Sequence, residues 1–247
     1  MQKQPDTQQP VHGLRPVMEA IASGARIERI YLQNGLTGSL ANELKNSIRQ
    51  AGLPFQYVPV EKLNKLAPGN HQGVVALIAA IAYRTFTDLA ESPEPPQLVL
   101  LLDHITDVRN MGAIARTAEC TGVGAIVVPD RGSAAINQDA VKTSSGALLR
   151  LPVCREPNLK TLINIAKQYG YQIVAATEKG SQHYRHVDFR RPTLLILGNE
   201  ETGVSNELLK MSDIRAKLPI VGEVSSLNVS VAAGVFLYEA LEQRLNN

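Results

Sequence analysis

The sequence has no tryptophan, two cysteines and few aromatic residues, which make up 4% of its 247 positions. Cys120 and Cys154 lie far apart among aliphatic neighbours, so we expect a reduced, cytoplasmic protein rather than a disulfide scaffold. No apolar run approaches the roughly 20 residues that a membrane-spanning helix needs. Residues 1–10 are polar and lack the apolar segment of a signal peptide, and we expect them to form a disordered leader.

A strong charge of either sign is also missing. The formal net charge is +2, with 19% charged and 44% hydrophobic residues. This apolar content is enough for a packed core. The mild charge neither requires nor excludes a nucleic-acid partner.

Several common fingerprints of catalytic and nucleotide sites are absent. We find no GxGxxG after the first strand of the second half, no GxxxxGK[ST] and no GxSxG, which argues against the usual dinucleotide, nucleoside triphosphate and serine hydrolase sites. His183 and His186 are three residues apart, but no cysteine or carboxylate stands beside them at metal-ligand spacing. We therefore expect a surface pair there and no metal site.

Hydrophobic periodicity divides the chain into two α/β regions. Residues 11–83 alternate short strands and helices and form a small first domain. Residues 84–97 carry three prolines in their last five positions, which predicts an extended spacer and a domain boundary. Residues 98–247 alternate more regularly, with strands expected at 98–102, 125–128, 173–177, 194–197 and 217–221 and a closing helix at 229–245. Such alternation predicts a mostly parallel sheet covered by helices on both faces.

Polar residues and glycines recur directly after the expected strands of the second domain. They occupy residues 103–112, 177–180, 198–203 and 222–228. In an open parallel sheet, ligands bind beyond the carboxyl ends of the strands. A core needs no such residues there, so the pattern predicts a ligand site at this edge. Ser226 and Asn228 precede the closing helix and are typical of a helix N-terminus.

Three of these segments resemble the motifs of the SpoU/TrmH family of RNA 2′-O-methyltransferases, in the SPOUT superfamily. They are NMGAIARTA at 110–118, LGNEETG at 197–203, and LPI at 218–220 followed by SSLNVSVA at 225–232. Their order and spacing make the resemblance specific, and it covers about residues 98–245. More weakly, VHG at 11–13 and HQGVVA at 71–76 resemble an L30e-like RNA-binding domain.

The resemblance implies a SPOUT-type α/β fold in which the C-terminal segment forms a deep trefoil knot, preceded by the L30e-like domain. It also implies that S-adenosylmethionine, the methyl donor, is held largely by backbone groups. The residues that it assigns to the donor are Gly198, Leu218, Ile220 and Leu227. Thr177 is a further candidate because it follows a strand. A homodimer packed through the closing helix is expected as well.

The same resemblance assigns catalytic roles. Arg116 is expected to act on the ribose 2′-hydroxyl or its neighbouring phosphate. With a pKa above about 12 an arginine is a poor base, so we assign it to stabilising alkoxide charge and leave the general base open. Asn110 and Asn228 are expected to orient the ribose or the motif loops, with Ser226 in the same cluster. Glu200 is expected to hold Arg116 or a backbone N–H.

The predicted function is methylation of a ribose 2′-hydroxyl in structured RNA, with a guanosine of 23S rRNA as the first choice. A tRNA ribose or an rRNA adenosine is an alternative substrate. A non-catalytic RNA-binding or ribosome assembly factor of the same fold is an alternative of another class. The intact motif residues speak against it, and the missing glycine fingerprint speaks against a nucleotide-dependent oxidoreductase.

Overall fold

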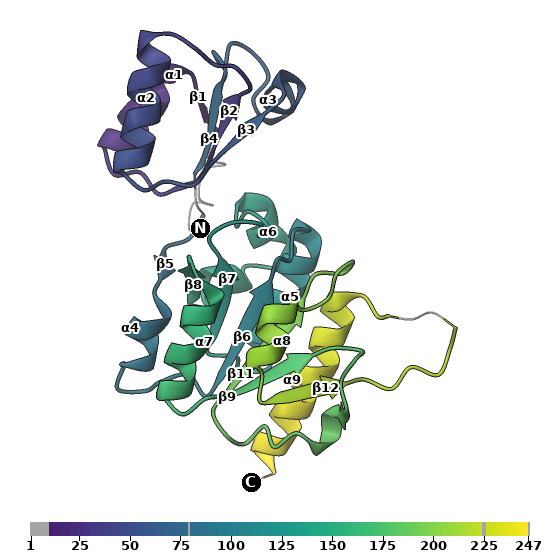
Figure 1. Ribbon diagram of the computed structural model, residues 1–247. Coiled ribbons are helices and arrows are strands. Elements are labelled where there is room, and N and C mark those ends of the chain that lie inside the picture. The colour runs from purple at the N-terminus through teal and green to yellow at the C-terminus, as the bar shows by residue number, and fades with distance from the viewer. Residues whose placement is uncertain (1–9, 79, 224–225, 247) are drawn as a thin grey trace, which may run out of the picture. The chain divides into compact units, whose positions relative to one another are not determined.

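The computed structural model describes residues 10–78, 80–223 and 226–246 (Figure 1). The chain divides into two compact units. The first contains the residues up to Ala82 together with Ala135–Gln138, and the second contains Tyr83–Ala134 and the residues from Asp139 onward. The expected leader, residues 1–10, lies outside the described residues except for Pro10. None of the described helices is long and apolar enough to cross a bilayer.

The first unit is a four-stranded mixed sheet flanked by three helices. The strand order is β1-β4-β2-β3. The strands are β1 (Val11–His12), β2 (Ile27–Gln33), β3 (Phe55–Val58) and β4 (Val74–Ile78). The helices are α1 (Leu14–Ala22), α2 (Ser39–Gln50) and α3 (Val60–Leu66). Residues of α1 and α2 pack in one apolar cluster with the sheet, and α3 packs in another.

A buried histidine organises the turn before β4. The His71 Nδ1 atom accepts a hydrogen bond from Gly73 N at 3.0 Å, and its Nε2 atom lies 2.9 Å from Asn64 Oδ1. Gln72 Oε1 accepts from Leu14 N at 3.0 Å, at the start of α1. The two segments that resemble an RNA-binding domain therefore lie against each other.

The second unit contains an eight-stranded sheet in which every pairing is parallel. The strand order is β10-β12-β9-β11-β6-β7-β8-β5. The strands are β5 (Tyr83–Arg84), β6 (Leu98–Asp103), β7 (Ala125–Pro129), β8 (Val153–Glu156), β9 (Gln172–Ala176), β10 (Gln182–His183), β11 (Thr193–Gly198) and β12 (Ile214–Lys217). The helices are α4 (Phe86–Ala90), α5 (Val108–Cys120), α6 (Gln138–Thr143), α7 (Leu159–Gln168), α8 (Asn206–Met211) and α9 (Val229–Leu245), with short 3₁₀ turns η1 (Ala147–Leu149) and η2 (Tyr184–His186).

Helices cover both faces of this sheet, as the alternation of strands and helices predicts. All six residues of β6 are buried. Apolar residues of α4, α7 and α8 form one cluster with alternate residues of the strands. Helices α5 and α9 pack on each other, and α9 also contacts β11. The predicted parallel α/β fold is confirmed.

The segment 84–97 differs from the expected extended spacer. It contains α4, whose Phe86 and Leu89 are buried in the core of the second unit. The Thr85 hydroxyl accepts from Asp88 N at 3.2 Å and caps the helix, and Phe86 N donates to Glu156 Oε1 at 2.7 Å. The prolines begin only after the helix ends, so they do not prevent it. The domain boundaries themselves stay a prediction.

Two other boundaries also differ from the sequence pattern. The expected strand at 217–221 is instead β12 at Ile214–Lys217, and Val221 is 99% exposed. The apolar run that follows β12 therefore serves a surface rather than the core. The apolar pattern of residues 139–149 is compatible with one helix, but the segment divides into α6 and η1, because Gly146 adopts a left-handed conformation with φ 85° before η1. Both cysteines are free.

The carboxyl end of α9 is fixed to the body of the second unit by hydrogen bonds. Gln243 Oε1 accepts from Phe189 N at 2.9 Å, and the Arg244 guanidinium donates to Phe189 O at 2.8 Å and Gln97 O at 2.9 Å. Burial lowers the pKa of Arg244. These contacts fix the position of α9 and thereby of its first residues. Residues 224–225 of the C-terminal segment lie outside the described residues, so the knot stays a prediction.

Candidate functional site

The carboxyl ends of β6 and β11 lie side by side in the middle of the parallel sheet. Asp103 and Gly198 are register partners at the last position of these two strands. After β6 the chain continues to β7 on one side, and after β11 it continues to β12 on the far side of β9. The two connections thus leave the adjacent ends of β6 and β11 in opposite directions. This divergence opens a crevice beyond the strand ends, where ligands of parallel α/β proteins bind.

A cavity of about 400 Å³ lies on the β9, β11 and β12 side of this crevice. Its size is in the range of small-molecule and cofactor sites. Its lining comes from four stretches of chain, which are Ala176–Lys179, Leu197–Gly203, Leu218 with Ile220, and Ser226, Leu227, Val229, Ala232 and Phe236. All five residues that the sequence assigns to the donor line this one cavity, namely Thr177, Gly198, Leu218, Ile220 and Leu227.

The loop after β11 forms one wall of the cavity and has a tightly specified backbone. Asn199 Oδ1 accepts from Glu201 N at 2.9 Å, and Asn199 O accepts from Gly203 N at 2.8 Å. A Cβ atom on Gly198 would lie 2.1 Å from Gly203 C and 2.1 Å from Val204 N. Only glycine permits this close approach of two backbone segments. The wall of the cavity here is therefore main chain.

The end of β6 holds this loop at both of its ends. Asp103 is buried, and its Oδ2 atom accepts from Ser205 N at 2.7 Å. Its Oδ1 atom lies 2.6 Å from His104 Nδ1, and His104 O accepts from Asn199 Nδ2 at 2.9 Å. The Asp103 carboxylate thus links β6 to the loop that lines the cavity.

Three of the predicted catalytic residues meet although they come from three distant segments. Asn110 Nδ2 donates to Glu200 Oε1, and Asn228 Nδ2 donates to Asn110 Oδ1 at 3.1 Å. Asn228 also caps α9, since its Oδ1 atom accepts from Ser230 N at 2.9 Å. Asp107 caps α5 in the same way by accepting from Asn110 N at 3.1 Å. We call Asn110, Glu200 and Asn228 the motif cluster.

The remaining predicted residues lie at different places. Ser226 lines the cavity. Thr177 is buried, and its N atom donates to Ala216 O at 2.9 Å. Arg116 is exposed on α5, six residues after Asn110, and within the described parts of the chain its side chain makes no hydrogen bond or ion pair. Glu200 is expected to hold Arg116 or a backbone N–H, and in the described residues its Oε1 atom instead accepts from Asn110 Nδ2.

The charge of the lining suits a cationic ligand. Three carboxylates line the cavity, those of Glu178, Glu200 and Glu201, against one ammonium group, that of Lys179. S-adenosylmethionine carries a sulfonium charge and an ammonium group, and its adenine fits an apolar wall with backbone hydrogen-bonding groups. Leu218, Ile220 and Leu227 with the main chain after Gly198 provide such a wall, so the residues present fit this donor. Among the residues that the structure describes, no group of three metal-ligating side chains occurs.

Some residues of the site are not singled out by the sequence pattern. Asp103, Glu178 and Asn199 belong to the polar segments that follow strands, and this position is the signal that could have identified them. Their individual roles depend on backbone geometry, because Asp103 and Asn199 act on the loop through main-chain groups.

The parallel sheet, with a cavity at its switch point and the motif cluster beside it, defines an α/β protein with a small-molecule site. Comparison with known families is more specific. The model of the SpoU rRNA Methylase family matches residues 97–238. A second family model, RNA 2'-O ribose methyltransferase substrate binding, matches residues 10–84. The chain belongs to the SpoU rRNA methylase family.

Individual relatives agree with this assignment. A protein described as a TrmH family tRNA/rRNA methyltransferase of Staphylococcus haemolyticus is 36% identical over 94% of both chains. The corresponding protein YacO of Bacillus subtilis is 33% identical over 95% of both chains.

Solved structures with a similar fold include two that hold the donor. The SpoU methyltransferase AviRb of Streptomyces viridochromogenes with AdoMet has a TM-score of 0.61 and 27% identity, covering 96% of this chain and 91% of that one. An AdoMet-bound rRNA methyltransferase of Sinorhizobium meliloti has a TM-score of 0.61 and 26% identity, covering 94% and 86%. The chain is therefore an RNA methyltransferase that uses S-adenosylmethionine, which confirms the prediction of its family, enzyme class and donor.

Proposed function

We propose that this enzyme methylates the 2′-hydroxyl of a ribose in structured RNA, with a guanosine of 23S rRNA as the first candidate. The observation that carries the proposal is the motif cluster beside a donor-sized cavity. The match of the first unit to a substrate-binding model for RNA 2′-O ribose methyltransferases supports the choice of ribose. The two-unit layout supports rRNA as the substrate. A tRNA ribose is the alternative substrate, because a relative is described as a tRNA/rRNA methyltransferase.

Bound S-adenosylmethionine supplies an electrophilic methyl group, so the task of the protein side chains is to position the ribose. Holding the reacting groups in line can supply roughly 7–11 kcal/mol of the acceleration in favourable cases. Asn110 is placed for this role because Asp107 fixes its backbone and both Glu200 and Asn228 fix its amide. Ser226 faces the cavity from the segment that leads into α9.

Arg116 has the role of binding the RNA beside the reacting ribose. Its guanidinium is exposed and without a partner in the described residues, so it is available to a phosphate or to a developing alkoxide. Glu200 stays engaged with Asn110 and is not needed to hold Arg116. The general base stays open.

Mapping of methylated riboses tests the proposed function. We expect the purified enzyme with S-adenosylmethionine to methylate 23S rRNA from cells that lack its gene, at one ribose 2′-hydroxyl. Isolated tRNA from the same cells is the matched substrate control. Methylation of tRNA alone would contradict the rRNA proposal, and methylation of a base would contradict the ribose proposal.

We also propose a cytoplasmic homodimer that packs through α9. The face of α9 turned away from the core exposes Val231, Tyr238 and Leu245, which are 53%, 57% and 70% exposed. Apolar side chains in such a row are typical of an interface between subunits. We expect light scattering to give a dimer for the wild type and a monomer for Tyr238→Glu, because the added charge would be buried. Glu242→Gln, at another exposed position of α9, is the matched control, and a monomeric wild type would exclude the proposal.

A further inference from the structure

The exposed imidazole of His104 lies at the carboxyl edge of the sheet, and the cavity and the motif cluster do not account for it. Its side chain is 54% exposed, although its partner Asp103 is only 2% exposed. Its backbone has φ 59°, in the left-handed region, where histidine is found more often than most residues other than glycine.

The ring is held in one orientation by two contacts. A carboxylate accepts hydrogen bonds, so His104 Nδ1 carries the proton that it donates to Asp103 Oδ1 at 2.6 Å. The ring also lies against Gly132, where a Cβ atom would be 2.6 Å from His104 Cδ2. In the neutral imidazole the remaining nitrogen, Nε2, is then a hydrogen-bond acceptor. Such a fixed acceptor suits a hydroxyl group.

Two guanidinium groups occur at the same edge. Arg131 precedes Gly132 in the loop after β7, and Arg109 lies in the first turn of α5, which follows β6. Strands β6 and β7 are neighbours, so their carboxyl ends lie together. Both arginines are exposed, and neither side chain has a hydrogen bond or ion pair within the ranges that the structure describes. The nearby Asp107 carboxylate is engaged by the N–H groups of α5.

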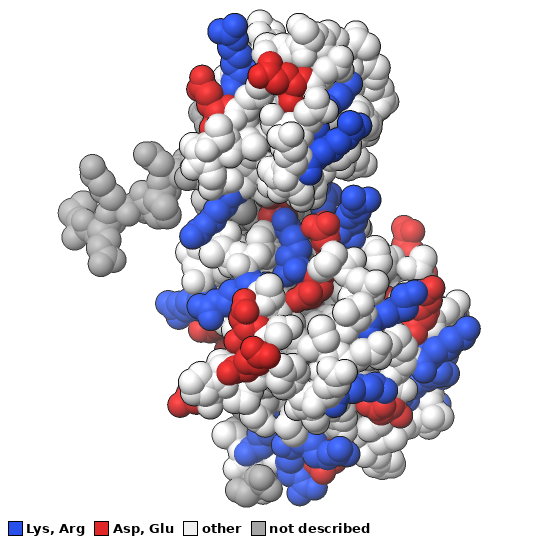
Figure 2. All heavy atoms as spheres, turned by 60° about the vertical axis from the view of Figure 1, so that its left-hand side comes forward, with Lys and Arg blue, Asp and Glu red and all other residues white. Residues whose placement is uncertain are grey.

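We propose that His104, Arg109 and Arg131 form an RNA-backbone subsite outside the donor cavity, in which His104 Nε2 accepts from a ribose 2′-hydroxyl and the two arginines bind phosphates. The proposal rests on the proposed function, since RNA is the substrate there. On the face shown in Figure 2, basic and acidic side chains are interspersed. A ribose hydroxyl is the group that distinguishes RNA from DNA.

The experiment measures binding of full-length protein to fluorescent twelve-residue oligouridylate and to its 2′-deoxy counterpart, which differ in the ribose alone. We expect the wild type to bind the RNA about three- to tenfold more tightly, which corresponds to one net hydrogen bond. In His104→Asn this preference should disappear, while binding of the deoxy probe stays unchanged. Asparagine tolerates the left-handed backbone, so the fold is kept.

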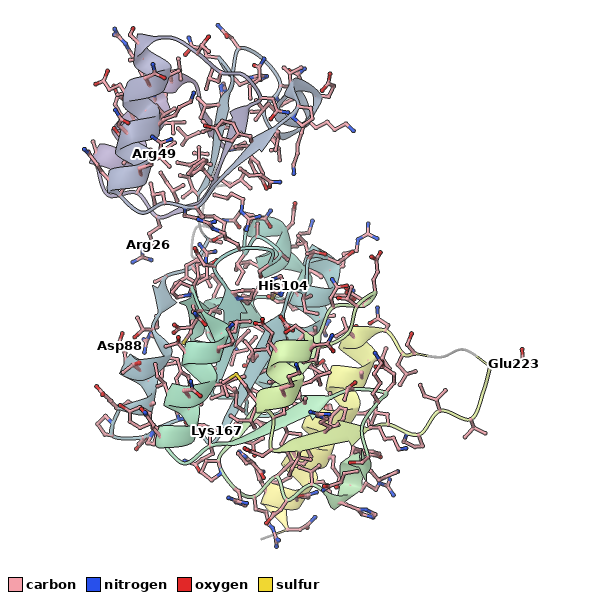
Figure 3. The ribbon with its side chains drawn as sticks, viewed as in Figure 1. Arg26, Arg49, Asp88, His104, Lys167 and Glu223 are labelled. Atoms are coloured by element: carbon pink, nitrogen blue, oxygen red, sulfur yellow. The ribbon has the colours of Figure 1, made fainter. Side chains whose placement is uncertain are left out.

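The arginine variants give a different result. Arg109→Gln and Arg131→Gln should weaken both probes, and each should reduce the slope of log K against log salt by about 0.7, the value for one phosphate of a single strand. Lys167→Gln is the control and should leave the binding of both probes unchanged. Lys167 forms an ion pair with Asp213 and lies in α7, before β9, at the edge of the sheet opposite to His104 (Figure 3).

The outcomes separate the subsite from the proposed function. A wild type that binds both probes equally or not at all, or a His104→Asn variant that keeps the preference for RNA, would overturn the subsite. An unchanged salt slope in both arginine variants would also overturn it. The binding assays need no methyl transfer. A failure of the enzyme to methylate rRNA would therefore contradict the proposed function, and it would leave the binding results for the subsite unchanged.

Discussion

Arg116→Ala is expected to reduce the rate of methyl transfer by about 10²- to 10³-fold, the usual loss when a charge-stabilising donor is removed. The affinity for S-adenosylmethionine should stay near the wild-type value, because Arg116 does not line the cavity. Its exposed position on α5 also predicts little change in the free energy of unfolding. Single-turnover kinetics with rRNA and calorimetry with the donor measure the two effects separately.

Two further variants sharpen this prediction. Arg116→Lys keeps the charge but loses the planar, two-pronged guanidinium, so an intermediate rate is expected. Lys210→Ala removes an exposed charge on α8 and should leave both properties unchanged. Equal losses of donor affinity and methyl transfer in Arg116→Ala would indicate a role in folding instead.

Gly198→Ala is expected to weaken donor binding by about ten- to hundredfold. The added methyl group would lie 2.1 Å from backbone atoms of Gly203 and Val204, and backbone atoms cannot yield as a flexible side chain can. Overpacking of this kind costs about 1–3 kcal/mol, and here the loop that lines the cavity must move to relieve it. Calorimetry with S-adenosylmethionine and urea denaturation measure both consequences.

A second glycine provides the matched control. A Cβ atom on Gly222 would meet no atom of the described residues within 4 Å. Gly222→Ala should therefore keep the donor affinity and the stability of the wild type. Wild-type donor affinity in Gly198→Ala would show that the loop is not the wall of the donor site.

The sequence predicts the site best where the motif residues directly follow a strand. The four donor residues assigned from the motifs line one cavity together with Thr177, which was assigned because it follows a strand, and Asn110, Glu200 and Asn228 come into direct contact. Each motif follows a strand, and parallel strands bring their carboxyl ends to one edge. The comparisons with known families and solved structures confirm the predicted family, fold class, enzyme class and donor. The roles of the individual site residues stay predictions.

The sequence is least informative where a local signal competes with tertiary packing. Prolines 93, 95 and 96 suggest a spacer, yet Phe86 and Leu89 bury a short helix just before them. The apolar residues at 218–221 suggest a strand, yet they follow the end of β12. Periodicity also cannot show which side chain Glu200 contacts, since Asn110 and Arg116 lie on the same helix. That choice depends on the path of the chain between distant segments.

The motif cluster has a consequence for the order in which the enzyme matures. Its three residues belong to α5, to the loop after β11 and to the cap of α9, which is translated after the other two. A nascent chain cannot assemble the cluster until α9 has docked. Because a ligand that binds only the finished arrangement stabilises it by mass action, cellular donor concentration would act on the last stage of folding as well as on turnover.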